Sequence, residues 1–397
     1  MQRDRSVALA CGGLLAMAAA LGIGRFVYTP ILPAMLGALV WSKSDAGLIA
    51  SAIFLGYLAG AQMAGRPFVA ARPRAWLLTA LALSAVSTAA MAAPSDIASF
   101  AALRFVGGIA SAFVIVCAST LVLERLAVSG RRSLSAVHFA GVGVGIVISA
   151  IAVSAMLASG AGWRSLWIGS GSIAMLAAMS AAALIPPAGN IAAASSKAKL
   201  PSAGHSRLGA MVVAYGLFGF GYVITATFLV TIVRLTDEVH VLEPWVWVLF
   251  GVAAIPSVAF WTWLSERIGI MNAYAAACAI EALSVAASVE WVTITGVCFS
   301  ALLLGGTFMG LTALGFMAAR ALSAANSHHA FGRMTASFGI GQMVGPLLAG
   351  FLSEQFGSFR VASLIAAAAL IAAAALAIWT SRAAANPGPA ILQAADR

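Results

Sequence analysis

Long apolar runs recur along the whole chain, and short polar breaks separate them. Six runs lie in the first half, at 7–36, 47–65, 75–93, 97–123, 133–158 and 165–185. Six more lie in the second half, at 208–233, 245–264, 270–289, 292–322, 331–352 and 359–380. Because a helix needs about 20 apolar residues to cross a bilayer, this pattern predicts about 12 transmembrane helices.

The polar segments divide the chain into two similar halves. The longest of them, 186–207, is rich in Ser, Ala, Lys and Pro, which is typical of a linker. We therefore predict a six-helix half at 1–185, a linker at 186–207, a second six-helix half at 208–381 and a disordered tail at 382–397. The predicted fold class is an all-α membrane protein with two pseudo-symmetric halves.

Composition excludes a soluble domain, and the positions of the basic residues predict a topology. Of the 397 residues, 62% are hydrophobic and 9% are charged, whereas soluble domains carry about 25% charged residues. With the N-terminus inside, 16 of the 22 Lys and Arg residues lie on the cytoplasmic side, four lie outside, and two lie within apolar runs. This bias predicts cytoplasmic termini and a cytoplasmic linker. The net charge of +10 is then topological, and we expect a lipid bilayer, not a nucleic acid, as the partner.

Glycine patterns repeat between the two halves. The string at 22–25 (Gly-x-Gly-Arg) returns at 219–222 as Gly-x-Gly-Tyr, and the spaced glycines at 141–145 return at 341–345. Both offsets are close to 200 residues, and both pair a helix with the sixth helix after it. Duplicated halves with a site between them are a transporter architecture. We interpret the glycines themselves as surfaces for close helix packing.

Several of these strings resemble motifs of the major facilitator superfamily. The segment 264–269 (Leu-Ser-Glu-Arg-Ile-Gly) is similar to the charged loop that latches the cytoplasmic gate in that family, which implies gate roles for Glu266 and Arg267. The matching loop at 65–74 keeps its glycine and Arg66 but lacks the usual aspartate. Arg104, followed by Gly108, resembles the fourth-helix arginine that takes part in proton coupling in some members.

A longer string points to a narrower branch. The residues at 22–33, Gly-Ile-Gly-Arg-Phe-Val-Tyr-Thr-Pro-Ile-Leu-Pro, together with 55–61 and 219–222, resemble the YbfB/YjiJ-type branch. That branch implies permease-like proteins with poorly defined substrates. We expect the chain to lie in the inner (cell) membrane of a bacterium. The resemblance therefore defines the family more sharply than the function.

Arg25 is the candidate for substrate contact, and two interpretations of it stay open. An arginine in an apolar run costs roughly 2.5–3.5 kcal/mol on insertion scales, so it needs water, a partner or a function. Facing a central cavity, it attracts an anionic group or pairs with a carboxylate, with Tyr28 and Thr29 beside it. If the first helix starts its crossing earlier, Arg25 reaches the outer interface and extends its side chain out of the lipid.

Two further intramembrane charges are candidates for proton coupling. Arg104 either takes part in coupling or donates to carbonyl groups of a neighbouring helix. Glu281 is the only acidic residue deep in an apolar run, and a carboxyl at the midplane that exchanges a proton suits proton-coupled transport. Its competing interpretation is a protonated structural glutamate, because ninth helices in this superfamily are usually peripheral.

Other polar residues lie on helices that line the cavity in similar transporters. Interhelical hydrogen bonding is the competing role for each of them. As further substrate-binding candidates we name Tyr57, Tyr222, Thr225 and Gln342. The four cysteines have no metal-ligand spacing, and the glycines at 141–145 follow no strand, so neither a metal nor a nucleotide cofactor is predicted.

These observations favour a secondary active transporter over an enzyme. The sequence contains no Walker-type loop, no His-Glu-x-x-His and no Gly-x-Ser-x-Gly. We expect a monomer that moves a small organic solute by alternating access, with Arg25 and Arg104 favouring an organic anion taken in with protons. The alternatives are a proton-driven exporter of amphipathic or cationic compounds, with Glu281 carrying the proton, and a membrane sensor that transports nothing.

Overall fold

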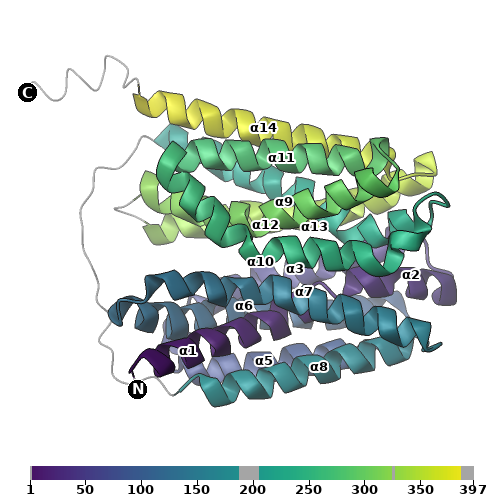
Figure 1. The fold of residues 1–397 in the computed structure, drawn as a ribbon, viewed down its shortest axis with the longest axis horizontal. Coiled ribbons are helices and arrows are strands. Elements are labelled where there is room, and N and C mark those ends of the chain that lie inside the picture. The colour runs from purple at the N-terminus through teal and green to yellow at the C-terminus, as the bar shows by residue number, and fades with distance from the viewer. Residues whose placement is uncertain (1, 187–204, 324–326, 386–397) are drawn as a thin grey trace, which may run out of the picture.

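The computed structural model describes residues 2–186, 205–323 and 327–385, and every secondary-structure element among these residues is a helix. The first half contains α1 (Gln2–Met17), α2 (Tyr28–Leu39), α3 (Lys43–Ala64), α4 (Pro67–Ala70), α5 (Pro73–Ala90), α6 (Ile97–Val128), α7 (Ser135–Ala158) and α8 (Trp163–Leu184). The second half contains α9 (His205–Arg234), α10 (Glu243–Ile268), α11 (Ile270–Glu290), α12 (Ile294–Leu322), α13 (Ser327–Phe356) and α14 (Arg360–Ala385). Figure 1 shows the two halves as adjoining layers of roughly parallel helices.

Local sequence explains where the helices begin and end. Ser42 and Asp45 form a capping box at the start of α3, in which each side chain accepts a hydrogen bond from the backbone of the other. The carboxylate of Asp96 accepts a bond of 2.9 Å from the backbone nitrogen of Ser99 at the start of α6. Hydrogen bonding to the side chain of Ser99, and next to its backbone, lowers the pKa of Asp96. Gly269, with a φ of 83°, separates α10 from α11.

The predicted boundaries of the halves differ slightly from the helix ends. Helix α9 begins at His205, inside the predicted linker, and α14 ends at Ala385, inside the predicted tail. The rest of that linker and of that tail, 187–204 and 386–397, lies outside the described residues.

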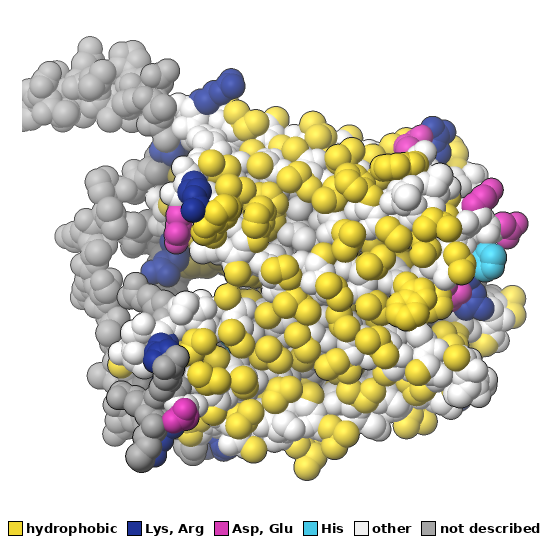
Figure 2. All heavy atoms as spheres, in the orientation of Figure 1, with side chains coloured by type: hydrophobic (Ala, Val, Ile, Leu, Met, Phe, Trp, Pro, Cys, Tyr) yellow, Lys and Arg dark blue, Asp and Glu magenta, His cyan; other side chains and the backbone are white. Residues whose placement is uncertain are grey.

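The apolar runs produce a bundle with a hydrophobic flank. Eleven of the described helical segments are long and apolar enough to cross a membrane. Helix α5, with 18 residues, is not among these eleven and is shorter than each of them. In Figure 2, hydrophobic side chains cover the flank of the molecule, while charged side chains gather at its two ends. Lipid requires this arrangement, because an unpaired charge in the hydrocarbon region costs several kcal/mol. The chain is a multi-pass membrane protein.

The apolar run at 7–36 lies within one membrane-span candidate, Asp4–Leu39, but the helix of this span is interrupted. Helix α1 passes into a π-helical turn, η1 (Ala18–Ile23), then a turn at 24–27, and α2 follows. The backbone nitrogen of Gly24 donates five residues back, to the oxygen of Ala19, instead of four. Pro30 follows this segment, and its ring lacks the N–H that the carbonyl group of Phe26 needs in a regular helix. The first helix is therefore broken around Arg25.

Glycine pairs bring equivalent helices of each half into backbone contact. A Cβ atom on Gly22 would lie 2.6 Å from the Cα of Gly145, so η1 and α7 touch through two glycines. In the second half, a Cβ on Gly341 of α13 would collide with the backbone oxygen of Gly216 of α9. The repeated glycine strings thus pack the first helix against the fifth and the seventh against the eleventh, as close-packing surfaces do.

Candidate functional site: a central cavity with a buried arginine behind its inner wall

A cavity of ≈ 720 Å³ lies between the two halves. Its walls come from α3, α6 and α7 of the first half and from α10, α12 and α13 of the second half. The lining side chains are Tyr57, Ala61, Gln62, Arg66, Ile115, Val116, Ser119, Leu123, Phe139, Val258, Met309, Thr312, Ala313, Phe316, Phe331 and Thr335, with Gly65 and Gly332. Gln62, Arg66 and Gly332 are exposed, so the cavity opens where α3 ends and α13 begins. We call this the cavity end of the bundle.

The opposite end of the bundle is closed by contacts between the halves. The hydroxyl group of Thr29 donates to the oxygen of Ala226 over 2.8 Å, and the hydroxyl group of Ser51 donates to the oxygen of Met343 over 2.7 Å. The hydroxyl group of Ser44 donates to the carboxylate of Glu354 over 2.6 Å. We call this the closed end. A cavity that is open at one end and sealed at the other is one of the two states that alternating access requires.

Arg25 lies directly behind the inner wall of the cavity, between the halves. Its side chain is only 6% exposed, and its Nη2 donates over 2.9 Å to the Oε1 of Gln342 in the second half. The guanidinium lies 4.7 Å from the ring centres of both Phe54 and Tyr57, and Tyr57 also lines the cavity. Arg25 therefore does not extend out of the lipid, and the interpretation that it snorkels is wrong.

The described side chains that contact the charged guanidinium of Arg25 are neutral. In the part of the chain that the structure describes, no carboxylate forms an ion pair with it, and its Nε has no hydrogen-bond partner. Gln342 in turn donates from its Nε2 to the hydroxyl group of Tyr222. A buried cation without a counter-ion is costly, and cation–π contacts with the two rings offset only part of that cost. Arg25 is therefore a buried cation whose charge no described carboxylate neutralises.

Arg104 stabilises the break in the first helix. Its Nη1 and Nη2 donate to the backbone oxygens of Gly24 and Arg25, over 3.2 and 2.9 Å. Its guanidinium also lies 5.0 Å from the ring centre of Tyr28. Of the two interpretations left open by the sequence, the structure displays the bonding to carbonyl groups of a neighbouring helix. A role of Arg104 in proton coupling stays a prediction.

The remaining predicted substrate residues lie beyond the cavity wall. Tyr28 donates to the oxygen of Ala46 over 2.9 Å, and Thr29 belongs to the closed end. Tyr222 and Thr225 are buried on α9, and the hydroxyl group of Thr225 has no hydrogen-bond partner among the described residues. Among the predicted substrate-binding residues, Tyr57 alone lines the cavity in this conformation, within the described part of the chain. The substrate roles of the others stay predictions.

Glu281 lies on α11, which packs between α12 and α14 and contributes no lining residue to the cavity. Its side chain is fully buried, and no ion pair reaches it from the described residues. Thr307 of α12 is its polar neighbour. The geometry leaves both interpretations of Glu281 open, a proton carrier and a protonated structural residue.

The predicted gate residues form no ion pair with one another in the described part of the chain. Arg66 is exposed at the mouth of the cavity, while the guanidinium of Arg267 lies 3.6 Å from the ring centre of Trp263. Within the described residues, Glu266 forms no ion pair. A latch that closes the cavity end has no bond to make while the cavity is open there, so the gate role stays a prediction.

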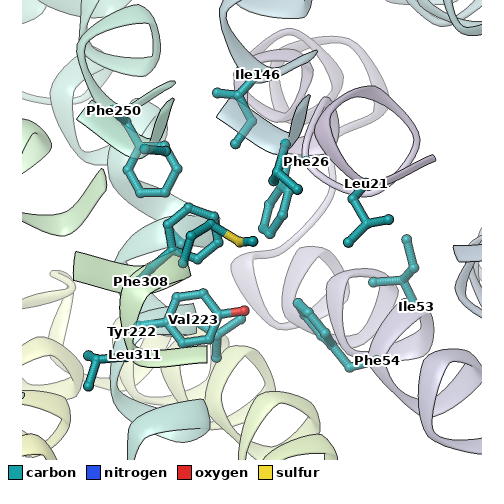
Figure 3. Close-up of a cluster of buried hydrophobic side chains, with 14 of the residues drawn as sticks. Leu21, Phe26, Ile53, Phe54, Ile146, Tyr222, Val223, Phe250, Phe308 and Leu311 are labelled. Atoms are coloured by element: carbon teal, nitrogen blue, oxygen red, sulfur yellow. The ribbon is translucent and has the colours of Figure 1, made fainter. Parts of the chain in front are cut away.

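Sequence reasoning missed most of the cavity wall. The missed residues with aromatic or hydroxyl side chains are Ser119, Phe139, Thr312, Phe316, Phe331 and Thr335. A further row of rings lies behind this wall, and Figure 3 shows Tyr222, Phe250 and Phe308 of the second half facing Phe26 and Phe54 of the first half. In a sequence, these side chains look like ordinary lipid-facing residues, because only the pairing of the halves distinguishes them.

Comparison with known proteins places the chain among transporters. The family model described as "Uncharacterised MFS-type transporter YbfB" matches residues 17–378. A mutant form of the nucleoside transporter NupG superposes with a TM-score of 0.73 at 14% identity, over 95% of this chain and 99% of that one. A bacterial homologue of the human lysosomal transporter Spinster, in an inward-facing and unoccupied conformation, gives 0.68 at 15% identity, over 95% and 97%. No curated protein matches the chain significantly in sequence. At these identities, the two structures establish the fold alone.

Proposed function

This chain belongs to the YbfB-type family of major facilitator superfamily transporters, and from that premise we propose that it moves a small organic anion by alternating access, together with a proton. Secondary transport itself follows from the family and the fold. We further propose that it acts as a monomer in the bacterial inner membrane, with both termini in the cytoplasm. The distribution of Lys and Arg supports this orientation.

One observation carries the anion proposal: the buried guanidinium of Arg25 has neutral partners only. The charge on the lining of the cavity beside Arg25 is also positive. Among the described residues that line it, Arg66 is the only charged one, and none is acidic. An anion entering this cavity meets a cation at the mouth and a second one behind the inner wall, and each favours its charge. A cationic cargo would meet repulsion at both points.

Glu281 is the proposed proton carrier. Loss of the proton leaves a buried, unpaired carboxylate, and that charge favours a conformation that hydrates it. Binding and release of the proton by Glu281 would thus shift the equilibrium between the two conformations, which differ in how the halves are arranged.

Flux measurements test the proposal. The purified protein is reconstituted in liposomes, a proton gradient is imposed, and uptake of a panel of organic anions, cations and neutral solutes is followed. We expect gradient-driven uptake of anions and its loss in Arg25→Ala, with normal uptake in Arg382→Ala, which removes an exposed arginine at the end of α14. Uptake of cations in exchange for protons would favour the exporter, and the absence of any flux would favour a sensor.

A further inference from the structure

The walls of the cavity carry rings as well as a positive charge. Four aromatic side chains line it, Tyr57, Phe139, Phe316 and Phe331, and they come from both halves. Phe316 and Phe331 contact each other, with ring centres 5.6 Å apart. The volume of ≈ 720 Å³ is in the range of pockets that enclose a drug-sized molecule. The cavity is therefore large enough for a substrate with one or two rings.

A row of nearly parallel rings lies behind the inner wall, next to Arg25. Tyr222 stacks on Phe338 with 7° between the ring planes, and on Phe308 with 20°. Phe308 stacks in turn on Phe250, with ring centres 5.2 Å apart. These rings come from α9, α10, α12 and α13, all in the second half. On the other side, Arg25 lies over the faces of Phe54 and Tyr57 of the first half.

This arrangement combines flat aromatic faces with one uncompensated cation. Aromatic rings prefer stacked or edge contacts with other rings, and such a pair is stronger than the burial of its area alone. A guanidinium binds a carboxylate through two parallel N–H···O bonds, and the Nε of Arg25 is free to make one of them. A substrate that satisfies both features carries a carboxylate next to a ring.

We infer that the substrate is an aromatic monocarboxylate, whose carboxylate binds Arg25 and whose ring packs against Tyr57. This inference rests on the proposed anion transport and adds the chemical class of the cargo. Ser119, Thr312 and Thr335 give the wall hydroxyl groups that bind a polar ring substituent. Arg66 at the mouth attracts the anion.

Binding of this class also acts on the contact between the halves. The carboxylate competes with the Oε1 of Gln342, the one hydrogen-bond acceptor that Arg25's side chain has among the described residues. A charged acceptor is the stronger partner, so the anion releases Gln342 and with it a bond between the first and second halves. The substrate thereby shifts the equilibrium between conformations, because it binds better where that bond is open.

Three matched probes separate the contribution of the aromatic ring to the affinity from that of the carboxylate. Binding of benzoate, benzamide and cyclohexanecarboxylate to the full-length protein in detergent is measured by calorimetry. We expect benzoate to bind about tenfold more tightly than either of the other two, which is the size of a ring contact or of a charge-assisted bond. Tyr57→Leu removes the preference for benzoate over cyclohexanecarboxylate, and Phe351→Leu, which alters an exposed ring on α13, keeps it.

The outcomes distinguish this inference from the transport proposal. Equal affinity for benzoate and cyclohexanecarboxylate overturns the aromatic class and leaves anion transport standing. Equal affinity for benzoate and benzamide overturns the role of the carboxylate. If none of the probes binds while another anion is taken up by the liposomes under a proton gradient, the aromatic class is wrong and the transporter proposal holds. If no solute of the panel shows gradient-driven flux, both proposals fail together.

Discussion

Arg104 donates from its Nη2 to the backbone oxygen of Arg25 over 2.9 Å, across 79 positions of sequence. Its Nη1 binds the oxygen of Gly24 in the same way. These two carbonyl groups lie just before Pro30, where the regular ladder of the first helix is interrupted. One buried arginine thus holds the backbone of the other, and Arg104 positions the guanidinium that we assign to the substrate.

Replacing Arg104 by alanine tests whether its two hydrogen bonds stabilise the break in the first helix. Arg104→Ala leaves two buried carbonyl groups without their donor, and the loss of charged hydrogen bonds costs ~2–3 kcal/mol. We expect a lower melting temperature of the detergent-solubilised protein. Arg164→Ala serves as the matched control, since Arg164 is exposed and donates to the oxygen of Ala92 over 3.1 Å. Equal melting temperatures for the two variants would contradict the structural role.

The sequence predicts some parts of this structure and not others, and the reason is physical in each case. Hydropathy fixes the membrane-crossing helices, because lipid tolerates few unpaired polar groups, and the basic loops suggest an orientation. The break around Arg25 is different. Pro30 is visible in the sequence, but the donors that bind the carbonyl groups of Gly24 and Arg25 come from Arg104, on another helix. The depth of Arg25 therefore could not be read from counting residues along one run.

Most of the cavity wall escaped prediction for a related reason. Phe316 and Phe331 line the cavity, yet Phe351 is 51% exposed on the flank of the bundle. All three lie in apolar helices. Phenylalanine suits a position that faces lipid as well as a position at the interface between the halves. Only the three-dimensional pairing of the halves decides which phenylalanine meets substrate and which meets lipid.

A carboxylate at position 342 offers a second prediction. Gln342→Glu places an acidic group where Oε1 now accepts from Nη2 of Arg25 over 2.9 Å. The new carboxylate satisfies the buried cation, so we expect the variant to fold and to bind organic anions at least about tenfold more weakly. Calorimetry with benzoate measures the affinity. Unchanged affinity together with an unchanged melting temperature would show that the substrate carboxylate does not bind at Arg25.

The glycine contact between η1 and α7 gives a third prediction. A Cβ on Gly145 would lie 2.8 Å from the Cα of Ala18 and 2.9 Å from that of Gly22, and backbone atoms cannot move aside cheaply. Gly145→Ala should cost about 1–3 kcal/mol of stability through overpacking. Gly209→Ala on α9 is the control, because no described atom outside its own stretch of helix lies within 4 Å of the added Cβ, and alanine favours a helix. Thermal melting of the two variants in detergent compares them, and a stabilised Gly145→Ala would contradict the close packing.

The last prediction concerns the proton. Glu281→Gln keeps the shape of the side chain but fixes it in a neutral state, so it cannot release a proton during the cycle. We expect uptake driven by a pH gradient to fall at least about tenfold, while exchange of labelled for unlabelled anion without a gradient continues, because that exchange requires no net proton movement. Both fluxes are measured in the same liposomes.

Glu290→Gln provides the control for this change on the same helix. Glu290 is exposed at the end of α11 and pairs with Arg360 at 2.6 Å. Losing an exposed, solvent-screened pair changes stability little, so both fluxes should stay near the wild-type values. If Glu281→Gln retains full pH-driven uptake, the proton follows another route, and Glu281 is a protonated structural residue packed beside Thr307. If gradient-free exchange is lost as well, the substitution disturbs the substrate site itself, and the separation between proton site and anion site is wrong.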